Sequence, residues 1–311
     1  MKYNWKNKEN RSGLLACKTD KELQKKFPDA TIESLRRLQR KFRSRTPAGK
    51  KIERTILLPD IHHPFYNAPA INAIKKFIAW FKPHRIVLVG DALEMRAIDH
   101  WKREKGNTRA FEGIRLLHDY KCFIDDILQP LEELCPNAEL IYLGGNHEEW
   151  AYQLVDKFPQ LEGIIEPEVA MKLEERGWKW IPYVQQDKSG NLRRGMLRIG
   201  KLTVIHGNYT NKFHSSKTAD TFSKSVCYGH SHDFQAFTKV HVEDPGDYHT
   251  AQSIGCLCDK SPQFMKGRPN RWVHCFGILY TRPSGHFNLY TPIIINGQFI
   301  FSDKLFDGNK S

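Results

Sequence analysis

The chain has 311 residues, of which 40% are hydrophobic and 27% charged, and its formal net charge is +13. This length predicts one large α/β domain with a small appendage, and no apolar stretch approaches the ~18–20 residues of a membrane span. The basic first residues lack the apolar segment of a secretory signal. We therefore predict a cytoplasmic protein without membrane association.

The seven cysteines are mostly scattered inside apolar runs, which predicts reduced, partly buried thiols. Cys256 and Cys258, followed by His274 and Cys275, suggest a zinc site. Their spacing fits no usual zinc module, so ordinary buried thiols are the favoured interpretation.

The positive charge is concentrated in the first part of the chain. Residues 1–54 contain 17 lysines and arginines and 6 acidic residues, a net charge of +11, which leaves about +2 for the remainder. Such asymmetry indicates a terminal module that meets an anionic polymer or surface.

Residues 13–44 predict a compact helical unit. Thr19 and Glu22 have the spacing of a capping box at the start of one helix, which Pro28 ends. Thr31 can cap a second, strongly basic helix over residues 32–45. Two helices joined by a tight turn resemble a helix-turn-helix DNA-binding module. We therefore predict a nucleic-acid-binding module over residues 1–50, with contacts from the second helix: Arg36, Arg37, Arg40, Lys41 and Arg43.

The alternative for this segment is a solvated basic helix packed on the rest of the chain. A membrane-surface helix is disfavoured, because the apolar stripe is narrow and contains no tryptophan. That stripe consists of Ile32, Leu35, Leu38 and Phe42.

The remaining residues, 51–311, alternate between predicted strands and helices. Strands are expected at 53–60, 84–91, 138–146, 178–183, 195–200, 201–207, 236–242, 248–257, 271–281 and 286–295, and helices at 67–81, 108–134, 147–158 and 166–177. This alternation predicts an α/β domain with parallel strands.

Five short polar clusters follow apolar runs of this domain. They are D-I-H at 60–62, G-D at 90–91, G-N-H-E at 145–148, H-G at 206–207 and G-H-S-H at 229–232. Side chains at the ends of several parallel strands converge on one sheet edge. If 60–62 and 230–232 are extended, both outer side chains of each triplet face the same side. Carboxylate, amide and imidazole groups suit Mn²⁺, Fe²⁺ or Zn²⁺.

The order and content of these clusters resemble the calcineurin-like metallophosphoesterase superfamily. Its pattern is D-x-H, G-D, G-N-H-[DE], a lone H and G-H-x-H, and all five elements occur here in that order, from Asp60 to His232. The resemblance implies a four-layer α/β-β/α sandwich over residues 51–311 that hydrolyses phosphoric esters. The alternative is scattered surface histidines and aspartates at strand ends.

The resemblance also implies a centre of two divalent metal ions, with Mn²⁺ favoured and Fe²⁺, Zn²⁺ or Ni²⁺ as alternatives. One metal would be bound by Asp60, His62 and His232, the other by Asn146, His206 and His230, with Asp91 bridging both. A metal-bound hydroxide would attack phosphorus, and His147 would protonate or polarise the leaving oxygen.

Three further residues near these clusters have open roles. His63 is either structural or close to the substrate. Glu94 could orient a ligand. Glu148 could orient His147 or cap the helix that follows.

The basic module indicates which class of substrate is favoured. Tethering it to a hydrolase would raise the local concentration of nucleic acid, which favours a DNA phosphodiesterase, a nuclease acting on single strands, ends or nicks. The arrangement resembles phosphoesterases encoded by bacteriophages, which would place the protein in the host cytoplasm. The alternatives are a phosphomonoesterase or nucleotide phosphodiesterase on small substrates, and a non-catalytic DNA-binding protein.

Overall fold

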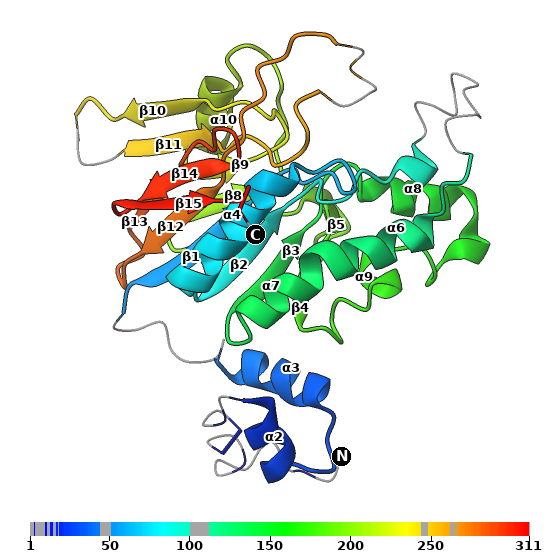
Figure 1. The fold of residues 1–311 in the computed structure, drawn as a ribbon. Helices are drawn as coiled ribbons and strands as arrows, with labels where there is room; N and C mark the ends of the chain where they lie inside the picture. Colours follow the sequence, from blue (N-terminus) through cyan, green and yellow to red (C-terminus); the bar gives the residue numbers. More distant parts are fainter. Residues whose placement is uncertain are drawn as a thin grey trace.

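The structure is a computed structural model that describes residues 3, 10, 13–14, 17, 19–43, 51–99, 112–243, 248–261, 265 and 267–310. Of residues 40–43 it describes the backbone alone. Two mixed β-sheets with helices outside them form its main body, and a small helical unit lies at one end of these sheets (Figure 1).

The first sheet has the strand order β13-β12-β1-β2-β3-β4. Its strands β1 to β4 run parallel. At one edge β12 pairs antiparallel with β1, and β13 pairs antiparallel with β12. The strands are β1 (Glu53–Leu58), β2 (Arg85–Val89), β3 (Glu139–Leu143), β4 (Trp178–Ile181), β12 (Gly277–Thr281) and β13 (Phe287–Tyr290).

The second sheet has the order β10-β11-β9-β8-β7, and β8, β9 and β11 run parallel. Its strands are β7 (Leu197–Ile199), β8 (Leu202–Ile205), β9 (Val226–Tyr228), β10 (Ala236–Val240) and β11 (Tyr248–Ser253). Two hairpins complete the described strands: β5 (Val184–Gln186) with β6 (Leu192–Arg194), and β14 (Gln298–Phe301) with β15 (Lys304–Asp307).

The described helices lie outside the sheets. They are α2 (Asp20–Lys26), α3 (Ile32–Arg43), α4 (Ala68–Phe81), η1 (Arg96–Ile98), α6 (Leu116–Phe123), the π-helical turn η3 (Ile124–Leu128), α7 (Gln129–Leu134), α8 (Glu149–Lys157), η4 (Pro159–Leu161), α9 (Pro167–Ala170) and α10 (His214–Phe222). None of the helices in the described part of the chain combines the length and the apolar character needed to cross a bilayer.

Side-chain alternation along the strands creates the layers. In β1, Leu57 packs between the two sheets, whereas Ile56 and Leu58 pack on the opposite face, which α4 covers. On the outer face of the second sheet, Val226 packs with Ala219 of α10. The result is an α/β-β/α sandwich, which confirms the fold class predicted from the sequence.

The helical stretch before β3 contains a π-helical turn that the sequence pattern does not reveal. Pro130 has no amide hydrogen for the carbonyl of Asp126, four residues earlier. The ammonium group of Lys75 donates to that carbonyl instead, at 2.7 Å. The chain therefore continues as α7 after one widened turn.

Three predicted elements differ most from the observed ones. The helix expected at 166–177 is limited to α9, because the backbone reaches the left-handed region at Lys172, where φ is 51°. In the strand expected at 271–281 only β12 is regular. Before it, His274 and Cys275 make isolated bridges, with Cys256 and Ile293 respectively. Of the helix expected at 108–134, residues 112–115 are not helical and α6 begins at Leu116, whereas 108–111 lie outside the described residues.

The N-terminal helices have a small core of their own. The predicted capping box is present, since Thr19 Oγ1 accepts from the Glu22 amide and Glu22 Oε2 accepts from the Thr19 amide. Gln39 is fully buried and donates to the carbonyls of Leu14 and Cys17. The core consists of Leu14, Cys17, Leu23, Phe27 and Leu35. Figure 1 shows α2 and α3 below the sheets, with α3 nearer to them.

Phe77 of α4 provides a test of the packing. It is fully buried and contacts Phe299 and Phe306 of the β14–β15 hairpin, so its removal leaves a cavity that rigid neighbours cannot fill. We expect Phe77→Ala to lower the free energy of unfolding by about 3–5 kcal/mol. Leu117→Ala, at an exposed leucine, should change it by less than about 0.5 kcal/mol. Denaturant unfolding measures both, and equal effects would contradict the assigned core.

Candidate metal centre

The five polar clusters of the sequence meet at one place in the structure. The carboxyl ends of β1, β2 and β3 in the first sheet and of β8 and β9 in the second lead directly into them. All seven predicted metal ligands lie within this region, and most are buried: Asp60, His62, Asp91, Asn146, His206, His230 and His232.

The backbone at the centre is strained. Five of these seven residues have positive φ values: Asp60 (44°), His62 (50°), Asp91 (44°), His230 (66°) and His232 (60°). A left-handed backbone costs a residue other than glycine roughly 1–2 kcal/mol, and such strain gathers at functional sites. The expectation of extended triplets at 60–62 and 230–232 is therefore wrong, because tight turns bring these side chains together.

The first group of side chains surrounds His232. Its Nε2 atom lies 3.2 Å from Asp60 Oδ1 and 3.1 Å from His62 Nε2. Asp60 is held by the backbone amide of His230, which donates to both carboxylate oxygens. One ring nitrogen of each histidine and one carboxylate oxygen therefore face a common point.

The second group surrounds His206. Its Nε2 atom lies 3.0 Å from Asn146 Oδ1, 3.2 Å from His230 Nδ1 and 3.2 Å from Asp91 Oδ2. Asp91 also approaches the first group, with Oδ2 3.9 Å from His62 Nε2. Asp91 thus stands between the two groups.

Both groups suit a divalent cation. Two ring nitrogens facing each other at hydrogen-bond distance can share only one proton, whereas a cation between them can bind both lone pairs. Each group offers three buried or half-buried atoms within 4.8 Å of one another: Asp60, His62 and His232 in one, and Asp91, His206 and His230 in the other. Nitrogen and oxygen donors of this kind fit borderline divalent metals.

Among the protein's own groups, opposite charges keep each other ionised. Burial would raise the pKa of Asp91, but imidazoles, His206 foremost, hold it well below its usual range. Burial would lower the pKa of His206, but Asp91 raises it to about 9, and Asp60 likewise raises the pKa of His232 to about 9. Burial and the charge of His206 lower the pKa of His230 to about 4. Cation binding here must therefore displace protons.

Outer partners fix the orientation of three imidazoles. His62 Nδ1 lies 2.7 Å from Glu94 Oε2, and His206 Nδ1 lies 3.0 Å from the carbonyl of Val89. His232 Nδ1 lies 3.8 Å from the sulfur of Cys258. Each contact turns the Nε2 atom of its histidine toward the centre, which is the usual arrangement around metal-ligating histidines. Glu94 therefore orients His62.

Glu148 holds the loops of the centre together. Its carboxylate makes no capping bond to α8. It accepts hydrogen bonds from the amides of Asp91 (3.1 Å), Leu93 (3.0 Å) and Gly145 (2.8 Å), and from the hydroxyl of Tyr142 (2.8 Å). The sequence motif marks the position of Glu148 but gives no sign of this role, because the partners come from two different strand ends.

His147 lies beside the centre with its ring in a fixed position. Its Nδ1 lies 2.9 Å from the carbonyl of Glu94, so this nitrogen donates and Nε2 faces Asp91 Oδ2 at 3.9 Å. Trp150 stacks on the ring with a centroid distance of 4.2 Å. Burial lowers the pKa of His147, but the carboxylates of Asp91 and Glu94 outweigh this and raise it.

His63 points away from the centre. Its Nε2 lies 2.9 Å from Oδ2 of Asp126 in η3, and its ring stacks on Tyr66. The structure therefore supports the structural role among the two left open by the sequence.

The predicted nucleic-acid-binding residues are only partly described. Arg36 is largely buried and forms an ion pair of 2.7 Å with Asp20, and it also donates to Gln39. This pairing binds α2 to α3 and places a negative charge beside the guanidinium. Arg37 is half-buried. The side chains of Arg40, Lys41 and Arg43 lie outside the described residues.

The chain matches no protein-family model and no curated protein. It resembles solved structures of wild-type Vps29 complexed with Zn²⁺ from Entamoeba histolytica (13% identity, 82% of this chain and 99% of that chain, TM-score 0.39) and of vacuolar protein sorting 29 from Cryptosporidium parvum (12%, 82% and 95%, 0.40). It also resembles an uncharacterised predicted phosphoesterase from Streptococcus pneumoniae (11%, 83% and 99%, 0.34). At these TM-scores the likeness carries no inference about this chain.

Glu148→Gln tests the bonds that hold the loops. The amide nitrogen of glutamine cannot accept a hydrogen bond, so at least one buried amide of Asp91, Leu93 or Gly145 loses its acceptor. We expect the free energy of unfolding to fall by about 1–3 kcal/mol. Glu174→Gln, at an exposed glutamate, is the matched control and should have little effect. Unchanged stability in Glu148→Gln would show that these bonds contribute little.

Proposed function

We propose that this chain is a metal-dependent phosphoesterase of the calcineurin-like superfamily. The observation that supports it most strongly is the position of Asp91 between two groups of buried nitrogen and oxygen donors. A carboxylate in this position can bridge two cations, and paired cations suit the hydrolysis of phosphate esters.

The two groups would hold one divalent ion each, with Mn²⁺ as the favoured metal. Asp60, His62 and His232 would bind one ion, and Asn146, His206 and His230 the other, with Asp91 shared. Metal ions bound there would lower the pKa of water, so that hydroxide forms near neutral pH, and would neutralise charge on the phosphoryl oxygens.

The protein's own residues would position groups and transfer a proton. His147 is held by the Glu94 carbonyl and by Trp150, so its Nε2 atom faces the site. In its protonated form this atom can donate to the leaving oxygen as a general acid. Asp91 keeps its place through Glu148 and through the bond from the His147 amide to its Oδ1.

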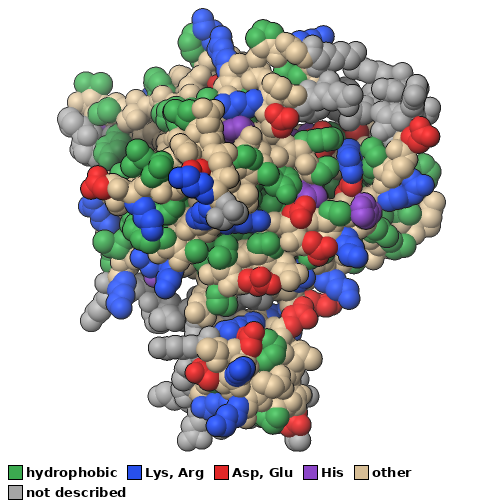
Figure 2. All heavy atoms as spheres, viewed as in Figure 1, with side chains coloured by type: hydrophobic (Ala, Val, Ile, Leu, Met, Phe, Trp, Pro, Cys, Tyr) green, Lys and Arg blue, Asp and Glu red, His purple; other side chains and the backbone are tan. Residues whose placement is uncertain are grey.

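We further propose that the substrate is a nucleic acid, with DNA favoured, and that the chain is a nuclease. Supporting this are the net charge of +11 in residues 1–54 and the two helices α2 and α3, which have their own small core. Figure 2 shows basic and acidic side chains mixed on this lower part of the molecule. The ion pair of Arg36 reduces the charge available, so the remaining basic residues of α3 would make the contacts.

Substitutions at Asp91 and His147 separate metal binding from proton transfer. We expect Asp91→Asn to lose metal from both positions and to abolish hydrolysis of bis-p-nitrophenyl phosphate. His147→Ala should keep both metals and still lose roughly 10²–10⁴-fold in rate, as for a general acid. Metal content by elemental analysis and turnover with Mn²⁺ are the measurements.

The exposed His118 offers a neutral control, and His118→Ala should keep metal and rate. His62, Asp91 and His147 also lie close enough together to hold an ion. If His147→Ala loses as much metal as Asp91→Asn, His147 is a ligand and the proposed proton transfer is wrong.

Charge reversal on the two N-terminal helices tests the nucleic-acid proposal. Arg37→Glu/Arg40→Glu/Lys41→Glu on α3 should weaken DNA binding strongly and reduce its dependence on salt, because fewer counterions are released. The matched change on α2, Lys21→Glu/Lys25→Glu/Lys26→Glu, alters the net charge equally and should weaken binding less. Fluorescence anisotropy with labelled DNA at several salt concentrations measures both.

Deleting residues 1–50 should give the same loss of DNA binding, with turnover of bis-p-nitrophenyl phosphate nearly unchanged. An equal loss on this small substrate would mean that the segment supports the fold of the body. Unchanged DNA affinity would remove the support for a nuclease and favour a phosphoesterase for small substrates. Absence of turnover in a metal-loaded chain would favour a non-catalytic protein.

A further inference from the structure

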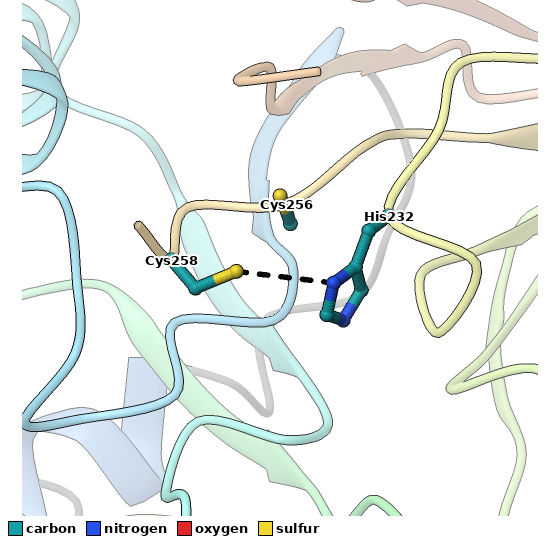
Figure 3. A group of neighbouring side chains, drawn as sticks. All are labelled: His232, Cys256 and Cys258. Atoms are coloured by element: carbon teal, nitrogen blue, oxygen red, sulfur yellow. Dashed lines mark hydrogen bonds between the residues drawn. The ribbon is translucent and has the colours of Figure 1, made fainter. Parts of the chain in front are cut away.

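His232 has a second polar face beside two thiols. Its Nε2 atom faces Asp60 and His62, whereas Nδ1 points toward Cys258 Sγ at 3.8 Å (Figure 3). Cys256 lies next to them, and all three ligand atoms fall within 4.8 Å of one another. The three residues are almost completely buried.

The distance between Cys258 and His232 is compatible with two ligands of one ion. With metal–sulfur and metal–nitrogen bonds of about 2.3 and 2.0–2.1 Å, the sulfur–metal–nitrogen angle at an ion bound to both atoms would be roughly 120°. Imidazole with two thiolates is a donor set that selects thiophilic cations such as Zn²⁺ over Mn²⁺ or Mg²⁺.

The backbone around the thiols is already fixed. The amide of Cys256 donates to the carbonyl of Val273, whose own amide donates to the carbonyl of His232. The amide of Leu257, between the two cysteines, donates to the carbonyl of Asp60. The thiols and His232 are therefore held together without an ion, which lowers the cost of binding one.

The structure also separates this cluster from the zinc site considered on sequence grounds. His274 Nε2 lies 2.7 Å from the carbonyl of Cys258, and the thiol of Cys275 donates to the carbonyl of Ile254. His274 and Cys275 thus have other partners. The residue that joins the two thiols is His232, which precedes Cys256 by more than twenty residues.

We propose that His232, Cys256 and Cys258 form a binding site for a thiophilic divalent cation of the Zn²⁺ class, separate from the two positions around Asp91. The cation binds the two sulfurs and His232 Nδ1, and the two thiol protons leave to solvent. When Nε2 binds a second cation, the ring is an imidazolate, so its N–H proton leaves to solvent as well, and His232 serves both sites, one through each ring nitrogen. This site does not depend on the proposed phosphoesterase activity.

Cadmium is a suitable probe, because a cadmium–thiolate bond gives an ultraviolet charge-transfer band and nitrogen or oxygen ligands do not. The full chain, reduced with a phosphine, stripped by a chelator and reloaded with Mn²⁺, is titrated with Cd²⁺. We expect a thiolate band that saturates at one Cd²⁺ per chain. Cys256→Ser/Cys258→Ser should remove the band.

The matched control is Cys122→Ser, because Cys122 is another thiol near a histidine, 3.5 Å from His118 Nε2 on α6. This variant should keep the band. Circular dichroism verifies that the variants fold, and X-ray absorption at the cadmium edge of the unmodified chain should show sulfur neighbours. A band that survives the double substitution, or an unmodified chain without sulfur neighbours, would overturn the proposal. In that case the thiols serve only as hydrogen-bond partners of His232.

Discussion

The position of the Asp91 carboxylate is the constraint on which the centre depends. One oxygen accepts from the His147 amide, and the other faces His206 and the first group of donors. This arrangement leaves no room for a side chain at Gly145 in the loop after β3, since a Cβ atom there would lie 2.1 Å from Asp91 Oδ1. The glycine of G-N-H-E is thus required because the backbone passes so close to the Asp91 carboxylate. The same holds for Gly229 of G-H-S-H, where a Cβ would lie 2.0 Å from Asp60 Oδ2.

The strained turns are maintained by bonds between neighbouring loops. The amides of Asp60 and His62 donate to the carbonyls of Gly90 and Asp91, so the loop after β1 is bonded to the loop after β2. Glu148 adds the loop after β3 through a buried carboxylate. Several left-handed residues can persist because a strand of one of the two sheets holds the start of each turn and these bonds hold it to its neighbours. The stability of the sandwich therefore supports a backbone that would relax in isolation.

Much of the architecture could be predicted from the sequence, because buried parallel strands are continuous apolar runs and the polar clusters mark where they end. The strands leading to Asp60, Asp91, Asn146, His206 and His230 are examples. What could not be predicted depends on contacts between distant segments. Glu148 receives donors from two strand ends, Lys75 replaces the bond that Pro130 cannot make, and Arg36 is neutralised by Asp20. A motif or a count of charges contains none of these pairings.

His232 illustrates how such a pairing can join two chemistries. Its two ring nitrogens belong to one conjugated system, and with a cation at Nδ1 the ring can bind a metal through Nε2 only after it has lost its N–H proton. Occupation of the position held by Cys256 and Cys258 would therefore be coupled to metal binding beside Asp60, and the coupling is reciprocal by thermodynamic linkage. Since Cys258 contacts His232 Nδ1 even without an ion, the same thiol orients the ring when the thiolate position is free. The buried thiols thus offer two states of a single ligand, one with Nδ1 of His232 in contact with a thiol and one with Nδ1 bound to a cation.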